Sequence, residues 1–189
     1  MLGLNRHIHT GRDHQRNSKW RGMIGDLAMR EDELLGKTLV IVGMGAIGSR
    51  LARFAKAFDM RVLATKRDPS TAVGPADEVV TPDRLSDLVP QADFLALTCP
   101  LTPETTNIVD AGVLVAMRQT SYLINVARGQ CVDEPELVKA LDSGEISGAG
   151  IDHFWEDPLG ANSPFWGMTN VIITPHTGGE TRLYEERVI

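Results

Sequence analysis

Short apolar runs alternate with amphipathic stretches along most of the chain. Seven runs are rich enough in apolar and β-branched residues to be strands, at 38–42, 60–64, 77–80, 94–98, 122–126, 149–152 and 171–174. Helical patterns separate several of them, at 47–58, from 81 onward, at 110–117 and at 136–141. Strands that alternate with helices favour a parallel sheet. The pattern therefore predicts an α/β fold, a doubly wound parallel sheet with helices on both faces.

The most informative stretch lies at 37–58. A buried-strand pattern ends at the turn Gly43-Met44-Gly45-Ala46-Ile47-Gly48, and an amphipathic helix follows, with Ile47, Leu51, Phe54, Ala55 and Phe58 on one stripe. In a G-x-G-x-x-G turn the first glycine allows the bend, the second lets backbone approach a pyrophosphate, and the third lets the helix pack close to the strand. The helix N-terminus offers N–H groups to phosphates. We therefore expect a dinucleotide site in a Rossmann-type sheet.

The N-terminal part is predicted to be different from the rest. Residues 1–8 have a helical pattern, and 10–24 are polar and expected to be irregular, with Trp20 as an anchor. The histidines of this region, His7, His9 and His14, lack a nearby set of carboxylates or cysteines. We therefore interpret them as surface residues rather than as a metal cluster, and we expect no metal site in the protein.

The composition of the chain indicates which classes of partner and which compartment to expect. The chain has 189 residues, 42% hydrophobic and 23% charged, which is typical of a soluble globular protein. No apolar run approaches the roughly 18 residues of a membrane span, so we expect no membrane partner. The two cysteines, Cys99 and Cys131, cannot form a disulfide framework or a metal site by themselves, and a reduced, cytoplasmic setting is expected.

The net charge of −6 is unevenly distributed. Residues 1–30 hold six Lys/Arg against two Asp, a net of +4, which leaves −10 for the remainder. A basic arm could bind nucleic acid. The basic residues are scattered and lack aromatic spacing, so a solvated helix face is the favoured interpretation and no nucleic-acid partner is expected.

Residues that could bind a ligand or take part in catalysis lie where the predicted strands end. They are the glycines after the first strand, Lys66 and Arg67 after the second, Thr98 and Pro100 after the fourth, Arg128 after the fifth, Asp152 and Asp157 at and after the sixth, and His176 after the seventh. In open parallel sheets, ligands bind outside the carboxyl ends of the strands. These side chains are therefore expected to face one crevice.

The end of the second strand bears on the choice of cofactor. An NAD site usually has Asp or Glu about 20 residues after the glycines, where it binds the ribose hydroxyls. Here Lys66 stands 18 residues after Gly48 (66 − 48), and Arg67 follows. This pair would attract a 2′-phosphate, so NADP(H) is favoured over NAD(H). The alternative is that both side chains point to solvent.

Arg128 and His176 fit the reduction of a carbonyl. The Arg128 guanidinium offers a planar fork for a carboxylate and a neighbouring carbonyl. His176 is the obvious proton donor, and a carboxylate beside it would stabilise the imidazolium. The alternatives are that Arg128 forms a surface ion pair and that His176 is a hydrogen-bonded loop histidine. His153 is interpreted as a packing or supporting residue.

Several segments together resemble the nucleotide-binding domain of the D-isomer-specific 2-hydroxyacid dehydrogenases. They are the glycine turn at 43–48, Pro100-Leu101-Thr102-Pro103-Glu104-Thr105, Asn125-Val126-Ala127-Arg128-Gly129, the run at 152–158 and Thr174-Pro175-His176, in family order over about 35–180. The resemblance implies an oxidoreductase that transfers hydride between NAD(P)H and a small 2-oxo/2-hydroxy acid, with glyoxylate, hydroxypyruvate and pyruvate-like acids as the range.

The resemblance also implies roles for single residues. Arg128 would bind the 2-oxo acid, Asp157 and His176 would complete the catalytic set, and Asp152 would contact the nicotinamide carboxamide. The remaining cofactor contacts would come from Gly43, Gly45, Ala46, Ile47, Gly48, Lys66, Arg67, Cys99, Pro100, Thr105, Val126 and Ala127. Asp157 departs from the family, which usually has glutamate there, one methylene longer.

The resemblance divides the chain into three parts. Residues 1–34 would be a connecting helix and loop, 35–180 the NAD(P)-binding domain, and 181–189 the start of a C-terminal helix cut at its end. Family members generally have about a hundred further residues in front, which form most of a substrate domain. A homodimer through the connecting helix is expected. The alternatives are a nucleotide-binding module that uses the fold without turnover, and a truncated fragment without independent catalysis.

Overall fold

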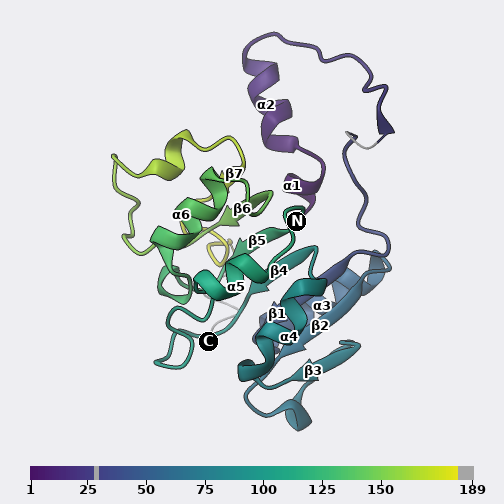
Figure 1. Cartoon of the computed structure of the whole chain (residues 1–189), viewed down its shortest axis with the longest axis vertical. Helices are drawn as coiled ribbons and strands as arrows, with labels where there is room; N and C mark the ends of the chain where they lie inside the picture. The colour runs from purple at the N-terminus through teal and green to yellow at the C-terminus, as the bar shows by residue number, and fades with distance from the viewer. Residues whose placement is uncertain (28–29, 183–189) are drawn as a thin grey trace.

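The protein is a seven-stranded parallel sheet with helices on both faces (Figure 1). The computed structural model describes residues 1–27 and 30–182. The strand order is β3-β2-β1-β4-β5-β6-β7, and every neighbouring pair is parallel. The strands are β1 (Thr38–Val42), β2 (Arg61–Thr65), β3 (Glu78–Val80), β4 (Phe94–Leu97), β5 (Tyr122–Asn125), β6 (Gly148–Ile151) and β7 (Val171–Ile173). The predicted doubly wound α/β fold is confirmed, with each strand within two residues of its predicted bounds.

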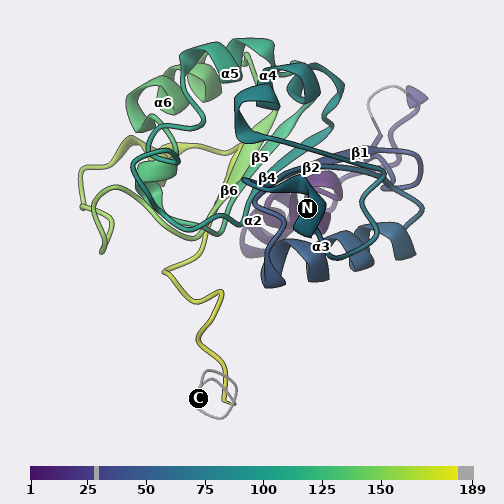
Figure 2. The same cartoon turned by 90° about the horizontal axis from the view of Figure 1, so that it is seen from below.

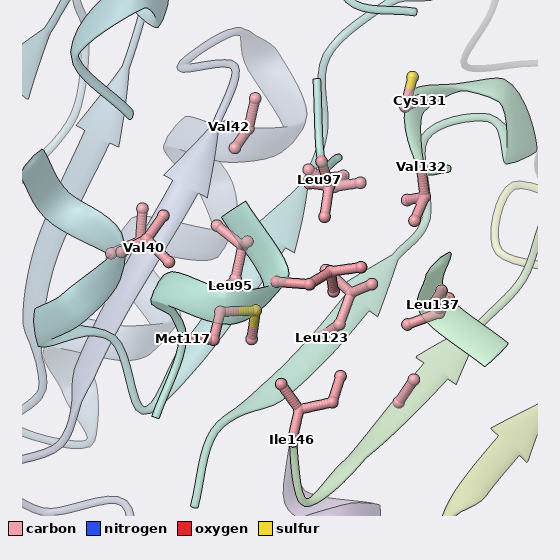
Figure 3. Packing of buried hydrophobic residues seen from close by; sticks show 14 of the residues in the cluster. Val40, Val42, Leu95, Leu97, Met117, Leu123, Cys131, Val132, Leu137 and Ile146 are labelled. Atoms are coloured by element: carbon pink, nitrogen blue, oxygen red, sulfur yellow. The ribbon is translucent and has the colours of Figure 1, made fainter. Parts of the chain in front are cut away.

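The central strands β1 and β4 are apolar from Leu39 to Val42 and from Phe94 to Leu97 because they are buried on both faces. Val40 and Val42 of β1 point into one core cluster, whereas Leu39 and Ile41 point into the other. The first cluster continues through Leu95, Leu97 and Leu123 to residues of the covering helices (Figure 3). Alternate side chains of one strand thus serve two cores, and this explains why β1 reads as a continuous hydrophobic run instead of an alternating one.

Two layers of helices cover the sheet (Figure 2). One face holds α4 (Leu85–Leu88), α5 (Ala111–Ala116) and α6 (Glu134–Asp142), and the other holds α3 (Ala46–Ala57) and α1 (Leu2–Asn5). Short 3-10 turns occupy η2 (Pro69–Thr71), η3 (Pro82–Arg84), η4 (Val89–Gln91), η5 (Gly129–Cys131) and η6 (Pro164–Gly167). None of the helices in the described ranges is long and apolar enough to cross a membrane.

The order in which the strands are added to the sheet changes direction between β1 and β4. From β1 the chain proceeds to β2 and β3 on one side of the sheet, and from β4 it proceeds to β5, β6 and β7 on the other. At such a switch point the connecting loops diverge and leave a crevice outside the carboxyl ends of the strands. The turn after β1 and the loop after β4 are therefore the elements that define the candidate site.

The N-terminal helices differ from their prediction. The single helix expected over 1–8 is two: α1 ends at Asn5, His7 adopts a left-handed backbone with φ 48°, and α2 covers Ile8–Arg16. The irregular segment expected over 10–24 is therefore helical in its first part. Trp20 is 97% exposed, so its predicted role as an anchor within this chain is wrong. In Figure 1, α2 and the segment after it extend away from the sheet.

The face that α3 buries was predicted correctly only in part: Ala55 is buried and Leu51 packs against the core, but the three largest side chains of the predicted stripe do not. Ile47, Phe54 and Phe58 are 63%, 57% and 45% exposed, whereas the helix buries Gly48, Ser49, Ala52 and Ala55. Close approach of the helix to the sheet requires small residues at the contact. The largest apolar side chains are therefore excluded from it, although their spacing is helical.

The helices begin near the predicted capping residues, but two of them start differently from their prediction. Asp110 caps α5 by accepting from the Val113 N–H, as predicted. The helix expected from 81 begins as a 3-10 turn, and the Thr81 side chain makes no capping bond. The helix predicted at 136–141 starts earlier, at Glu134, because Asp133 caps it and proline occupies its first turn. Of the C-terminal helix predicted over 181–189, residues 183–189 lie outside the described residues.

Candidate active site

The turn after β1 is built by glycines that have different surroundings. At Gly43, φ is +99° and an added Cβ would lie 2.7 Å from the Cys99 Cα. At Gly48 an added Cβ would lie 2.3 Å from the Gly43 carbonyl oxygen, which is the close helix–strand contact predicted for the third glycine. At Gly45 an added Cβ would meet nothing within 4 Å. The first and third glycines are thus required by the fold, and the second is open toward the crevice.

The N-terminus of α3 faces this crevice without a competing group. No side chain caps the helix, and its first turn contains no acidic residue. Gly45 occupies the N-cap position, and Ala46 and Ile47 are the first two helical residues. Because the backbone N–H groups of a helix N-terminus favour anions, these three residues can hold a phosphate group through main-chain atoms.

A cationic cavity of about 380 Å³ lies beside the glycine turn. Lys66 lines it, as the sequence predicts, together with Arg50 and Arg53 of α3. The Lys66 ammonium donates to the Thr71 carbonyl at 2.6 Å, and this bond orients the side chain. Arg67 is exposed and is not part of the lining. Its charge acts instead on Glu104, whose carboxyl pKa is lowered first by the Thr102 side chain and also by Arg67.

The loop after β4 is held against the glycine turn. The Thr98 hydroxyl donates to the Gly43 carbonyl at 2.7 Å, and the Cys99 backbone packs directly on Gly43. Further along, the Thr105 hydroxyl donates to the Pro100 carbonyl at 2.7 Å and closes the loop on itself. These contacts hold Cys99 against the glycine turn and keep Pro100 and Thr105 together in the loop that follows it.

The turn after β5 presents Arg128. The buried Asn125 side chain accepts from the Ala127 N–H and donates to the Arg128 carbonyl, both at 3.0 Å. The guanidinium of Arg128 is exposed and donates to the Ala127 carbonyl at 2.7 Å. Val126, 38% exposed, lies on the same turn. Asn125 therefore shapes the turn from which Arg128 reaches the crevice.

Asp152 fastens the segment that follows β7. Its carboxylate accepts from the Thr174 hydroxyl at 2.5 Å and from the Thr177 and Gly178 N–H groups, each at 3.0 Å. Burial raises the pKa of this carboxyl, but the bonds from Thr174, Gly178 and Thr177 outweigh burial, and the net pKa is lowered. The carbonyl of Asp152 also accepts from the His176 N–H at 3.0 Å. Asp152 thus holds the turn that carries His176.

Asp157 and His176 form a direct pair. The Asp157 carboxylate lies 2.6 Å from the His176 Nδ1, and the two side chains are 45% and 49% exposed. The backbone of His176 is left-handed, with φ 55°, an unusual conformation for a residue other than glycine. The pairing leaves Nε2 as the ring nitrogen available to a ligand. The shorter carboxylate of Asp157 thus reaches the imidazole in this protein.

A second imidazole packs on this pair. His153 is only 6% exposed, and its ring centroid lies 3.7 Å from that of His176. Burial, then the charges of His176 and Arg128, lower the pKa of His153, so its neutral form is favoured. His153, Asp157 and His176 each place a potential ligand atom within 4.8 Å of the others, so this group could hold a metal ion. This geometry was not anticipated from the sequence, which predicted no metal site.

Backbone contact joins the Arg128 turn to the Asp157 segment. An added Cβ at Gly129 would lie 2.0 Å from the Phe154 carbonyl carbon. The same segment is also bonded to α6 and to the end of η5, because the Trp155 N–H donates to Glu134 at 3.0 Å and its indole N–H donates to the Val132 carbonyl at 2.8 Å. The two halves of the candidate catalytic set are therefore fixed relative to each other by main-chain packing.

The structure brings most of the predicted site residues to one edge of the sheet. The glycine turn, the loop after β4, the Arg128 turn and the Asp157–His176 pair all follow the carboxyl ends of neighbouring parallel strands. Asn125, Arg50 and Arg53 were not predicted as site residues. Arg50 and Arg53 are three residues apart, a spacing that puts them on one side of α3.

Comparisons with known proteins identify the family that the chain resembles. The family model described as D-isomer specific 2-hydroxyacid dehydrogenase, NAD binding domain, matches residues 1–178. The chain is 40% identical to a D-3-phosphoglycerate dehydrogenase from Synechocystis sp. over 184 residues, which is 96% of this chain and 32% of the relative. It is 40% identical to a glyoxylate reductase from Aeropyrum pernix over 166 residues, 86% of this chain and 49% of the relative.

A solved structure with bound cofactor is also similar. The NADPH-dependent glyoxylate/hydroxypyruvate reductase from Sinorhizobium meliloti, in complex with NADP and sulfate, superposes with a TM-score of 0.83 at 28% identity. The match covers 99% of this chain and 58% of that protein. The chain thus spans between about a third and three fifths of the proteins it matches here.

Proposed function

The chain belongs to the D-isomer specific 2-hydroxyacid dehydrogenase family, and we propose that it supplies the cofactor-binding and proton-transfer half of an oxidoreductase. The reaction would transfer a hydride between NADP(H) and a small 2-oxo/2-hydroxy acid, in the range of glyoxylate, hydroxypyruvate and pyruvate-like acids. We assign residues 35–180 to the NAD(P)-binding domain and 1–34 to a connecting and association segment.

The observation that carries this proposal is the Asp157–His176 pair at the crevice. With Nδ1 bound to Asp157 at 2.6 Å, the protonated ring can donate from Nε2 to the oxygen of a substrate carbonyl. The carboxylate stabilises the imidazolium and orients the ring. The exposed guanidinium of Arg128 would bind the substrate carboxylate through its planar fork. Bound NADPH would supply the hydride.

The direct test is reduction of 2-oxo acids. Purified chain, alone and combined with the substrate-domain half of a relative, is mixed with NADPH and each of glyoxylate, hydroxypyruvate and pyruvate, and cofactor absorbance is followed. We expect turnover at least in the combined sample, and a loss on the order of 10²-fold or more with His176→Gln, since general acid catalysis contributes about 10²–10⁴-fold. Tight NADPH binding without turnover in any sample would favour a nucleotide-binding module instead.

The cationic cavity supports NADP(H) as the preferred cofactor. Lys66, Arg50 and Arg53 line the same space beside the glycine turn, and no carboxylate is among its lining residues. A 2′-phosphate placed there would accept charge-assisted hydrogen bonds, each contributing about 1.5–3 kcal/mol. The cofactor seen in the Sinorhizobium meliloti relative is also NADP.

Replacing one cation tests this preference. Lys66→Ala is expected to weaken NADPH binding by about 10- to 150-fold, the equivalent of about 1.5–3 kcal/mol, and to change NADH binding less than about twofold. Lys139→Ala is the matched control, because Lys139 is an exposed lysine of α6, on the opposite face of the sheet. Equal losses for NADPH and NADH would contradict the assignment of Lys66 to the 2′-phosphate.

We also propose that the protein is a cytoplasmic homodimer. The N-terminal segment exposes large apolar side chains, with Trp20 97%, Met23 89% and Leu27 73% exposed. Such a surface favours association with a second copy. Free thiols at Cys99 and Cys131 fit a reducing compartment. Sedimentation equilibrium should give a dimer that Trp20→Asp converts to a monomer, and a monomer at all concentrations without the substitution would refute the association.

A further inference from the structure

Three side chains that can bind a metal ion lie together at the carboxyl edge of the sheet. His153 and Asp157 are on the segment that follows β6, and His176 follows β7. Each residue has a ligand atom that lies within 4.8 Å of those of the other two. The His176 Nδ1 is 2.6 Å from an Asp157 oxygen, and the two imidazole centroids are 3.7 Å apart. Asp157 and His176 are 19 residues apart along the chain, so tertiary structure forms this cluster.

The imidazole of His153 has ring nitrogens that are not hydrogen-bonded. Although the residue is only 6% exposed, neither nitrogen forms a hydrogen bond within residues 1–27 and 30–182. Its ion-pair partner, the Asp152 carboxylate, is 3.7 Å from Nε2, which is beyond hydrogen-bond distance. No side-chain nitrogen or oxygen in these ranges is both fully buried and unpaired, so the ring nitrogens of His153 reach the surface of the site. A nitrogen that is accessible and unpaired can bind an ion.

The three side chains differ in mobility and in access to solvent. The residues on either side of His153 are anchored, because the Asp152 N–H donates to the last carbonyl of β5 at 2.9 Å and Phe154 is buried in the larger core cluster. Asp157 and His176 are 45% and 49% exposed. The site therefore combines one fixed ligand with two that an ion can reach from solvent.

Two imidazoles and one carboxylate are a ligand set for zinc. Open zinc sites have three protein ligands of these types and a fourth position for water, whereas Mg²⁺ and Ca²⁺ prefer oxygen ligands. Tetrahedral zinc ligands at about 2.0–2.1 Å from the ion lie about 3.3 Å from one another, so the exposed Asp157 and His176 side chains would separate slightly from their present 2.6 Å. The positive charge of Arg128 opposes a cation here, but the carboxylates of Asp152 and Asp157 outnumber it.

We propose that His153, Asp157 and His176 form a zinc site, and that zinc bound there inhibits the protein. One atom of each side chain would hold the ion, and water would occupy the open position. An imidazole must be neutral to bind a metal ion, so a zinc-bound His176 is not an imidazolium. The inhibition, unlike the binding, rests on the proposed function, in which protonated His176 donates to the substrate carbonyl. Zinc and the proton therefore compete for the same side chain.

Zinc binding is measured without cofactor or substrate. The chain is purified without a histidine tag, stripped with EDTA, dialysed, and titrated with Zn²⁺ in competition with a chromophoric chelator. We expect one ion per chain, bound with micromolar or tighter affinity and not displaced by excess Mg²⁺. His153→Gln, Asp157→Asn and His176→Gln should each weaken binding by at least about 100-fold, because loss of a group that merely supports a ligand already costs about 10- to 100-fold.

The other three histidines of the chain provide the matched control. A single variant with His7→Gln, His9→Gln and His14→Gln should keep the zinc affinity within about twofold of the parent, because independent sites do not couple. Asp157→Asn and His176→Gln alter exposed side chains, and urea unfolding verifies that each variant is folded. No zinc binding by the parent, loss of binding in the control, unchanged affinity in the site variants, or a thiolate charge-transfer band with Co²⁺ would overturn the proposal.

A second measurement tests the inhibition on the sample that reduces 2-oxo acids. We expect Zn²⁺ to lower turnover by at least about tenfold, because general acid catalysis contributes about 10²–10⁴-fold, and EDTA to restore it. Relative to its own zinc-free rate, His153→Gln should lose less than about twofold on addition of the same Zn²⁺, because its site lacks a ligand. Bound zinc with unchanged or increased turnover would refute the inhibition. Absence of turnover in every zinc-free sample would refute the proposed function and leave the zinc titration standing.

Discussion

Gly129→Ala places a methyl group inside another part of the backbone. The Cβ of the alanine would lie 2.0 Å from the Phe154 carbonyl carbon, 2.1 Å from its oxygen and 2.4 Å from the Trp155 nitrogen. None of these atoms belongs to a flexible side-chain end. Either the η5 turn or the segment at 154–155 must therefore move.

The size of the movement and its cost follow from these distances. Ordinary van der Waals contact begins at 3.4 Å, so the two segments must separate by at least 1.4 Å (3.4 − 2.0). Overpacking costs about 1–3 kcal/mol, and loss of the two hydrogen bonds of Trp155 adds about 1 kcal/mol each. The sum is about 3–5 kcal/mol of unfolding free energy, or about 6–20 °C in Tm for a chain of this size.

Urea and thermal unfolding of the parent and variant measure this loss. Gly167→Ala is the matched control, because an added Cβ there would meet nothing within 4 Å and its φ is not positive. We expect the control to change the unfolding free energy by less than about 0.5 kcal/mol. A loss below about 1 kcal/mol for Gly129→Ala would refute the argument that the η5 turn and the 154–155 segment are locked by backbone packing.

Two further substitutions separate folding from ligand binding and pH response. Gly45→Ala should keep the unfolding free energy within about 0.5 kcal/mol of the parent value, because the added Cβ meets no protein atom within 4 Å. If a phosphate occupies that space, the same substitution should weaken NADPH binding by at least about tenfold. Unchanged NADPH affinity would place the phosphate elsewhere. Burial lowers the pKa of His153 in the folded chain below its ordinary value of about 6.5. Below about pH 6.5 the unfolded chain therefore binds a proton that the folded chain does not, and the free energy of unfolding decreases as the pH is lowered. His153→Gln should therefore show a smaller loss of unfolding free energy between pH 7.5 and 5.5 than the parent, as measured by urea unfolding, and equal losses would exclude His153 as the source.

The strands and the glycine turn could be predicted because their signals are local. A strand buried on both faces is expected to be apolar along its length, and β1 is buried at every residue and apolar at every residue after Thr38. Gly43 and Gly48 are required by contacts within a short strand–turn–helix unit and with Thr98 and Cys99, the two residues that follow β4. For the same reason the order of elements was enough to indicate a parallel sheet and its functional edge.

The face of α3 was predicted correctly only in part, and the N-terminal helices incorrectly, because the deciding contacts are distant in sequence. Hydrophobic spacing correctly favoured Ala55 and Leu51 but also favoured Ile47, Phe54 and Phe58, which stay exposed because the fully buried positions of α3 hold only small residues. Trp20 was expected to be an anchor on the basis of its size alone. Whether a large side chain is buried depends on a surface that faces it, and the described part of the chain offers Trp20 none.

The sequence by itself determined which residue types reach the carboxyl edge of the sheet, because each follows a strand directly. Only the tertiary structure decided how they combine: Asp157 with His176, His153 against that ring, and Lys66 with Arg50 and Arg53. These partners come from loops or elements that meet through packing of the two cores. A local pattern of hydrophobicity fixes where a strand ends, whereas the distance between two loop side chains depends on how every layer beneath them packs.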